Sequence, residues 1–272
     1  WLPAFLWVTL GTIFFAGIHD AGAIWASVRN KAKSIGTLTG EVVGHRARAI
    51  FSIVIFLVLL MVNAVFGVVI AKLLINNPGA VVPVWGAIAV ALVIGQAIYR
   101  AKMSLPLVSL IGVVALYALI YVGPSVPVEL PETVAGLSPS AAWIIILFVY
   151  AAIASLLPVW VLLQPRDYIN GLQLFVGLAA LYGAVLIANP TVVAPMINVD
   201  VPAGTPSMIP LLFVTIACGA ISGFHGLVSS GTTSKQLDKE TDARFVGYFG
   251  ATGEGALALA AIIAATAGFA SL

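Results

Sequence analysis

The chain has 272 residues, of which 61% are hydrophobic and 8% are charged, and its formal net charge is +2. Soluble domains have about 25% charged residues, so this chain has too few polar groups to cover a surface exposed to water. The small net charge argues against nucleic-acid binding, and the single cysteine, Cys218, excludes an internal disulfide. The composition predicts an all-α polytopic membrane protein, because lipid leaves no partners for unpaired backbone groups.

Hydropathy windows of about 19 residues predict about eight transmembrane helices that cross a hydrocarbon core of about 30 Å, the third of which is short. The apolar runs are too long and too uniform for the alternating strands of a membrane β-barrel. The predicted spans cover residues 2–26, 49–75, 83–99, 105–122, 141–164, 171–188, 207–232 and 245–272. The sequence does not begin with methionine. We expect residues 1–272 to form a single transmembrane domain that is a partial core of a longer protein.

The basic residues predict one orientation for all of these spans. Eleven of the twelve lysines and arginines lie in alternate loops, at residues 27–48, 100–104, 165–170 and 233–244. The positive-inside rule places these four loops in the cytoplasm. The exception is Lys72, near the outer end of the second span, where a long side chain can reach the interface.

Four ionisable residues lie inside the predicted spans: His19, Asp20, His225 and Glu254. Such residues are costly in a membrane and commonly mark solute or proton pathways. At about 1.5 Å per residue from the nearest cytoplasmic charge, Asp20 lies roughly 13 Å deep, and His225 and Glu254 lie roughly 15 Å deep. Three helices therefore bring ionisable groups to a similar depth, as a site requires. The alternative is that these residues only bond neighbouring helices.

The seventh span has polar residues at spacings of 3, 4, 3, 4 and 3, which would place them on one stripe of a helix. They are Thr215, Cys218, Ser222, His225, Ser229 and Thr232. We expect this stripe to face protein or a water-filled path, and a packing seam of small residues is the alternative. Near its inner end, Ser229, Ser230, Thr232 and Thr233 form a hydroxyl cluster. The hydroxyls of Ser229, Ser230 and Thr232 are candidate ligands for Na⁺.

Pro158 lies in the middle of the fifth span and cannot donate a backbone hydrogen bond, so the carbonyl of Ala154 is freed. Interrupted helices near the bilayer midplane commonly form ion or substrate sites in transporters. A simple proline kink is the alternative.

Enzymatic and metal-binding functions find little support in the sequence. Residues 226–233, GLVSSGTT, have the glycine spacing of a phosphate loop, but Thr232 stands where lysine is needed. An intramembrane serine protease would need more context than the SSG triplet provides. Three scattered histidines and one cysteine make a weak metal site. The sequence therefore predicts no enzyme, no resident cofactor and no metal centre.

Three segments closely resemble the carbon starvation protein A (CstA) family. They are residues 16–36, AGIHDAGAIWASVRNKAKSIG; residues 156–171, LLPVWVLLQPRDYING; and residues 216–240, IACGAISGFHGLVSSGTTSKQLDKE. The third segment is similar to that family's SGFHALISSGTTPK motif, with Ser234 in place of the proline and Gly226 in place of an alanine. A Gly/Pro-rich motif that family members have upstream of the HD segment is absent.

The resemblance implies a secondary active transporter of the bacterial inner membrane that imports peptides or small carboxylates such as pyruvate during carbon starvation. It also implies cation coupling by Na⁺ or H⁺, and a leucine-transporter-type inverted-repeat fold of the APC superfamily. On this basis the candidate solute and ion pathway consists of His19, Asp20, Pro158, Ser222, His225, Ser229, Ser230, Thr232, Thr233 and Glu254. Expected partners are a small solute, membrane lipid and the remainder of the chain or a partner subunit. A non-transporting membrane subunit and a channel are the alternative functions.

Overall fold

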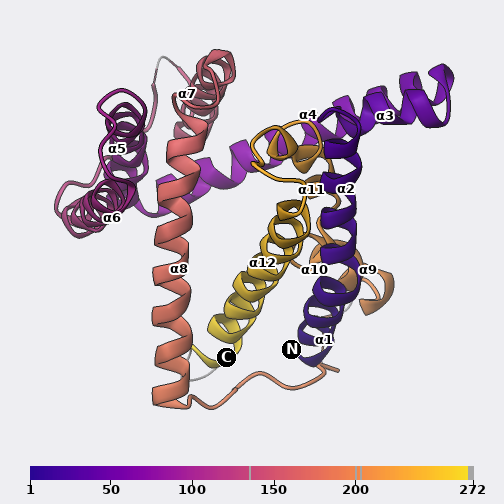
Figure 1. Cartoon of the computed structure of the whole chain (residues 1–272). Coiled ribbons are helices and arrows are strands. Elements are labelled where there is room, and N and C mark those ends of the chain that lie inside the picture. The colour runs from indigo at the N-terminus through magenta and orange to yellow at the C-terminus, as the bar shows by residue number, and fades with distance from the viewer. Residues whose placement is uncertain (135, 200, 203, 269–272) are drawn as a thin grey trace. The chain divides into compact units, whose positions relative to one another are not determined.

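The structure is a computed structural model that describes residues 1–134, 136–199, 201–202 and 204–268 (Figure 1). Regular structure in these residues is helical, apart from one isolated bridge between Val134 and Leu137. Seven helical segments of the described residues are long and apolar enough to cross a membrane: Leu2–Arg29, His45–Asn76, Pro78–Tyr99, Leu105–Ser125, Pro139–Leu156, Leu163–Ala188 and Asp242–Ala267. The predicted all-α class is confirmed, and these segments fit a polytopic membrane protein.

The chain divides into two compact units. The first unit consists of Trp1–Ile55 and Leu178–Leu272, and the second consists of Phe56–Gly177. Two helices, α4 (His45–Asn76) and α8 (Leu163–Ala188), contribute residues to both units. The assignment of residues 1–272 to a single transmembrane domain stays a prediction.

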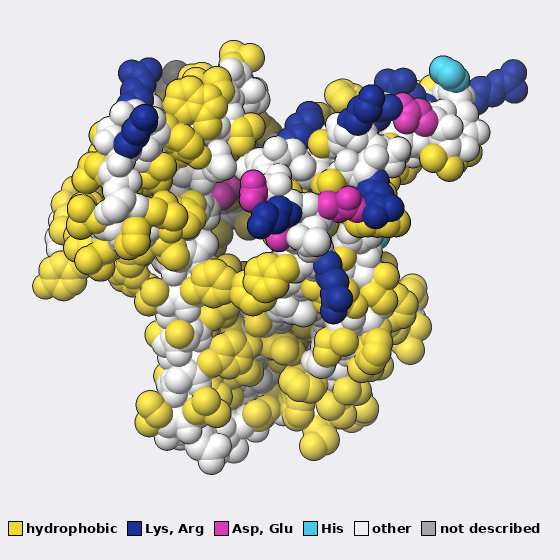
Figure 2. Space-filling view, in the orientation of Figure 1, with side chains coloured by type: hydrophobic (Ala, Val, Ile, Leu, Met, Phe, Trp, Pro, Cys, Tyr) yellow, Lys and Arg dark blue, Asp and Glu magenta, His cyan; other side chains and the backbone are white. Residues whose placement is uncertain are grey.

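The first unit is built around a continuous helical rod at the N-terminus. The rod consists of α1 (Leu2–Gly11), a π-helical turn η1 (Thr12–Ala16) and α2 (Gly17–Arg29). The C-terminal helix α12 (Asp242–Ala267) packs along α2, as Figure 1 shows. In Figure 2 the charged side chains of this unit gather where α2 ends, and the surface beside α1 is hydrophobic.

Glycines allow α12 to approach the rod closely. A Cβ atom at Gly247 would lie 2.5 Å from the backbone nitrogen and Cα of Ala21. A Cβ atom at Gly255 would lie 2.6 Å from Thr12 Oγ1. Small residues at helix contacts are typical of membrane proteins, in which dispersion contacts and not water exclusion drive helix association. At Gly247, α12 therefore lies directly against the backbone of α2, and at Gly255 it lies directly against the Thr12 side chain of the rod.

The predicted seventh span, 207–232, is not one continuous helix. It consists of three short helices, α9 (Met208–Thr215), α10 (Ala217–Ile221) and α11 (Gly223–Ser229). The backbone leaves the helical region at Ser222, where φ is −33° and ψ is 97°. The prediction that the polar residues of 215–232 share one helical stripe is therefore wrong, because each interruption changes the helix phase.

The second unit contains the C-terminal part of α4, α5 (Val81–Tyr99), α6 (Leu105–Val122), α7 (Pro139–Leu156) and the N-terminal part of α8. Short 3-10 turns, η2 (Pro78–Ala80) and η3 (Gly123–Ser125), follow α4 and α6. Ala71, Leu74, Val81 and Trp143 form one buried cluster, and Ile94, Val108, Leu116 and Ile169 form another. The first cluster joins α4, α5 and α7, and the second joins α5, α6 and α8.

The fifth predicted span, 141–164, is interrupted near Pro158. Helix α7 ends at Leu156, Leu157 is extended, and α8 begins at Leu163. Pro158 therefore lies in a break between helices and not in a kinked continuous helix. The predicted loop 165–170 is wrong as a loop, because these residues are helical in α8. The first loop and the fourth are partly helical too, since α2 ends at Arg29, α3 covers Ile35–Val42 and α12 begins at Asp242.

Gly247→Ala is expected to lower the free energy of unfolding by about 1–3 kcal/mol, because the added methyl group meets the backbone of Ala21. Gly250→Ala in the same helix is the matched control, since a Cβ atom there would meet nothing within 4 Å. The control is expected to be neutral or stabilising, because alanine favours helices over glycine. Thermal unfolding in detergent, followed by circular dichroism, compares the variants. Equal melting temperatures for both would contradict the packing described for α2 and α12.

Candidate functional site

A chain of four ionisable side chains crosses the first unit; His19, Asp20, His225 and Glu254 make up this carboxylate–histidine chain. Asp20 on α2 is only 4% exposed, and its Oδ2 lies 2.7 Å from Nδ1 of His225 on α11. The other ring nitrogen of His225, Nε2, lies 2.5 Å from Oε2 of Glu254 on α12. Asp20 Oδ1 lies 2.9 Å from Nδ1 of the neighbouring His19. The structure thus brings together the four ionisable residues that the sequence places inside the membrane.

His225 lies between two carboxylates, and this position determines which protonation states of its two ring nitrogens give attractive contacts. With both ring N–H groups present, His225 donates one hydrogen bond to Asp20 and one to Glu254. Transfer of the Nε2 proton to Glu254 keeps the second hydrogen bond, with the carboxyl as donor. Loss of that proton leaves an imidazole lone pair facing a carboxylate, which is repulsive at this distance. An attractive contact between His225 on α11 and Glu254 on α12 therefore requires a proton between them, whichever of the two residues carries it.

Cys218 and Ser222 extend this chain on the side of Glu254. The Cys218 thiol donates to Glu254 Oε1 at 3.2 Å, and it lies 3.9 Å from Ser222 Oγ. Ser222 is buried and precedes α11, and its carbonyl accepts from the backbone N–H of His225 at 3.1 Å. The sequence singled out Ser222 as a candidate but not Cys218, although both lie in the regularly spaced polar series.

Backbone irregularities place the members of the carboxylate–histidine chain. The π-helical turn Thr12–Ala16 ends immediately before α2, which holds Asp20 in its first turn. Single π turns within α-helices occur frequently at functional sites. The break at Ser222 starts a new helix, so that the phase of α11 is independent of α10. Both irregularities lie beside the ionisable residues that they orient.

A second polar cluster joins the turn after α2 to the segment after α11. The Ser27 hydroxyl donates to the carbonyl of Lys33 at 2.7 Å and lies 2.8 Å from the Ser234 hydroxyl. Because the Ser27 proton is already engaged, Ser234 is the donor in the contact between the two hydroxyls. The backbone N–H of Gly231 lies 3.1 Å from Ser27 Oγ and 2.9 Å from Ser234 Oγ. Gly231 has a φ of +83°, which glycine adopts without strain.

The predicted hydroxyl ligands have different surroundings. Ser230 Oγ accepts from the backbone N–H of Ile35 at 3.0 Å, so Ser230 helps to hold the start of α3. Ser229 Oγ is buried without a hydrogen-bond partner among the described residues. The Thr232 side chain is exposed and Thr233 is half-buried. A Na⁺ site formed by Ser229, Ser230 and Thr232 stays a prediction.

Pro158 belongs to the second unit, whereas the other predicted site residues belong to the first. Sequence reasoning missed Ser27 and Ser234 as members of a polar cluster. Their hydroxyls meet across 207 positions of the sequence, so local spacing gives no signal for this contact. It also missed the ion pair between Arg29 and Glu240, which joins the same two segments.

The chain is similar over nearly its whole length to a family of known proteins. The family model described as carbon starvation protein CstA matches residues 1–269. A "Peptide transporter CstA" of Campylobacter jejuni is 32% identical over 97% of the chain, which covers 38% of the relative. The "Pyruvate/proton symporter BtsT" of Escherichia coli is 34% identical over 98% of the chain, covering 38% of that protein. A "Peptide transporter CstA" of Bacillus subtilis is 33% identical over 98% of the chain, covering 45%.

The chain thus spans less than half the length of these curated relatives. No solved structure matches it. The resemblance found in the three sequence segments therefore extends over nearly the whole chain.

Ser234→Ala is expected to destabilise the first unit by about 1–3 kcal/mol, because the N–H of Gly231 and the hydroxyl of Ser27 lose a buried partner. Ser27→Ala should cost a similar amount, and the double variant less than the sum, since the two residues share one network. Thr232→Val is the matched control, because the Thr232 side chain is exposed. Additive losses in thermal unfolding would show that the two serines act independently and would contradict the network.

Proposed function

Because the chain belongs to the carbon starvation protein CstA family, we propose that it is part of a secondary active transporter that imports an organic solute. The solute class proposed is peptides or small carboxylates such as pyruvate, taken up during carbon starvation. Relatives named peptide transporter and pyruvate/proton symporter support this proposal. The proposal includes no enzymatic step, and the solute, the lipid and the remainder of the transporter or a partner subunit are the partners.

The observation that supports this function best is the position of His225 between Asp20 and Glu254. Transport coupled to protons requires a group that gains and loses a proton, and a structural element that responds to the change. Here the shared proton stabilises the contact between α11 and α12, and its release replaces attraction with repulsion. Alternating protonation would therefore alternate the spacing of two helices in one unit.

Na⁺ is the second candidate coupling ion, and one observation favours it. Ser229 Oγ is buried without a hydrogen-bond partner among the described residues, so a bound cation would satisfy it. Hard cations prefer several oxygen ligands. Ser230, whose hydroxyl already accepts from Ile35, and Thr232 would be the further ligands. We propose the proton as the coupling ion, because the carboxylate–histidine chain joins three helices and its contacts depend on protonation.

The proposed fold is a partial leucine-transporter-type inverted repeat in the bacterial inner membrane. The interruptions at Ser222 and at Pro158 support it, since discontinuous helices are typical of such transporters. The segments 27–48, 100–104 and 233–244 are proposed to face the cytoplasm on the basis of their basic residues, and so is the start of α8, which contains residues 165–170.

The Asp20→Asn, Glu254→Gln double variant is expected to lose at least about 90% of the solute uptake that a proton gradient drives, because an amide cannot gain or lose the proton that coupling requires. Uptake of radiolabelled pyruvate and of a dipeptide into proteoliposomes measures the effect, with proton and Na⁺ gradients imposed separately. Glu132→Gln is the matched control, since Glu132 is exposed in an irregular segment.

Undiminished proton-driven uptake by the double variant would eliminate the carboxylate–histidine chain as the coupling site. Uptake that follows only the Na⁺ gradient and is lost in Ser229→Ala would favour the hydroxyl cluster instead. An absence of any flux, together with a second chain that copurifies, would favour a non-transporting subunit.

A further inference from the structure

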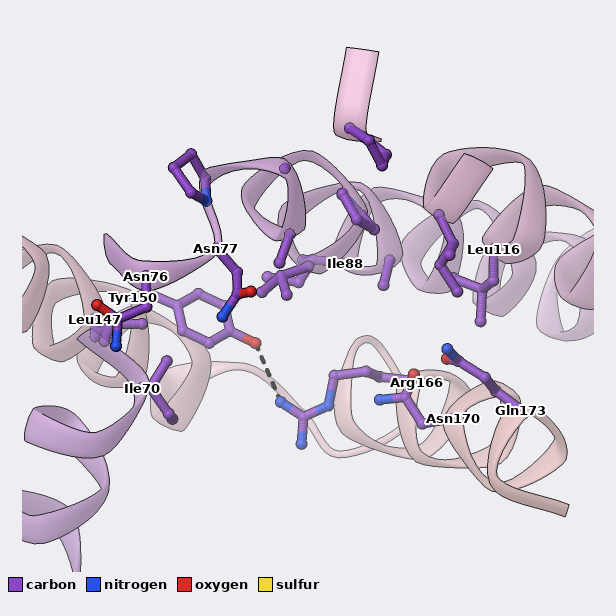
Figure 3. A pocket seen from close by; sticks show the side chains of 18 residues that line it. Ile70, Asn76, Asn77, Ile88, Leu116, Leu147, Tyr150, Arg166, Asn170 and Gln173 are labelled. Atoms are coloured by element: carbon purple, nitrogen blue, oxygen red, sulfur yellow. Dashed lines mark hydrogen bonds between the residues drawn. The ribbon is translucent and has the colours of Figure 1, made fainter. Parts of the chain in front are cut away.

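The second unit contains a cavity of about 990 Å³ that the carboxylate–histidine chain does not use. Residues of α4, α5, α6, α7 and α8 line it, so the cavity lies wholly within Phe56–Gly177. Its size is at the upper end of the range of about 300–1,000 Å³ for small-molecule sites. Figure 3 shows the cavity between Ile88 and Leu116 on one side and the polar residues of α8 on the other.

Half of the polar lining residues lie on one stripe of α8, and the others are Asn76, Asn77 and Tyr150. Arg166, Asn170 and Gln173 follow one another at spacings of four and three residues, so they share a helix face. All three line the cavity. Helix α8 is long and apolar enough to span a membrane, and charged residues within such helices usually face protein or a water-filled cavity. The three side chains therefore face the cavity, where they can bind a polar ligand.

Arg166 is held in place and retains unused donors. Its NH1 donates to Tyr150 OH at 3.2 Å, and its Nε and NH2 donate to Asp167 Oδ1 at 3.2 and 3.0 Å. A guanidinium group has five N–H bonds, so these three contacts leave two available. Tyr150 is itself packed edge-to-face against Trp85, with ring centroids 5.4 Å apart. The guanidinium is thus positioned by its neighbours before any ligand binds.

The amide groups beside Arg166 also lack partners. No side-chain hydrogen bond within the described part of the chain engages Asn170 or Gln173. Their NH₂ groups and the two remaining N–H bonds of Arg166 together form a set of donors on one helix face. Such a set suits a carboxylate, whose two oxygens accept several hydrogen bonds and which arginine binds with both ends of its fork.

Apart from Asn76, Asn77 and Tyr150, the remaining walls are apolar and define the rest of the ligand. Ile70, Val84, Ile88, Leu116, Ile120 and Leu147 contribute to them. An apolar wall does not hydrate a second charge or a strongly polar tail, whereas it gains free energy by covering hydrocarbon. We propose that this cavity binds an organic monocarboxylate with an apolar body, its carboxylate on Arg166, Asn170 and Gln173. This inference goes beyond the proposed function, since it concerns binding that can be measured without transport.

Equilibrium binding of radiolabelled octanoate to the purified protein in nanodiscs tests the proposal. Octanoate is expected to bind at least tenfold more tightly than octanamide, which has the same chain without the charge. Arg166→Gln should weaken octanoate binding by about tenfold or more, and Gln173→Leu by about threefold or more. Arg100→Gln is the matched control, because Arg100 lies in the same unit but does not line the cavity.

Gln173→Leu is included in case Arg166→Gln misfolds. It removes a donor from the cavity and leaves the contacts of Arg166 with Tyr150 and Asp167 in place. Binding of oleate in the membrane, measured with the same variants, distinguishes a lipid acid from a dissolved one. Loss of either acid in both cavity variants supports the site and identifies the source. Equal affinity for octanoate and octanamide would overturn the proposed carboxylate site. The site would also be overturned if neither Arg166→Gln nor Gln173→Leu changed the affinity for octanoate or for oleate.

Normal octanoate binding by the unmodified protein, together with no solute uptake by it, would support the cavity and contradict the proposed transport function. The binding and uptake measurements therefore fail independently.

Discussion

The contact between Asp20 and His225 is the interaction on which the candidate proton site depends. Asp20 is almost fully buried, and a buried carboxylate is costly unless charged or hydrogen-bonding partners surround it. Its partners are His19 and His225, and the other ring nitrogen of His225 contacts Glu254. Because these residues lie on α2, α11 and α12, satisfying one carboxylate fixes three helices. The glycine contacts between α2 and α12 make that approach possible, so polar pairing and close packing act as one constraint.

Interruptions of helices occur where the polar chemistry is found. Lipid cannot satisfy a free backbone group, so non-helical backbone is tolerated only inside protein or beside a water-filled cavity. The break at Ser222 adjoins His225, and the break after Leu156 precedes the stripe of α8 that begins with Arg166. In both cases an interruption sets the phase of the next helix. The apolar composition determines that helices form, and the interruptions determine where their polar faces point.

The clustering of Asp20, His225 and Glu254 could be predicted from sequence, because flanking basic residues mark the expected interface and helix rise is constant. The polar stripe predicted over 215–232 was wrong, because polar spacing does not reveal the change of φ and ψ at Ser222 that interrupts the helix. The link from Ser27 to Ser234 was not predictable, since it joins distant segments. Arg166 was assigned to a loop because basic residues served as loop markers, whereas its side chain lines a cavity.

Helix α8 connects the chemistry of the two units through one stretch of backbone. Its N-terminal half provides Arg166, Asn170 and Gln173 to the cavity of the second unit. In its C-terminal half, Tyr182 OH donates to the carbonyl of Ala256 on α12 at 2.7 Å, two residues beyond Glu254. Tyr182 and Ala256 both belong to the first unit, so this hydrogen bond joins the C-terminal half of α8 to α12 near Glu254.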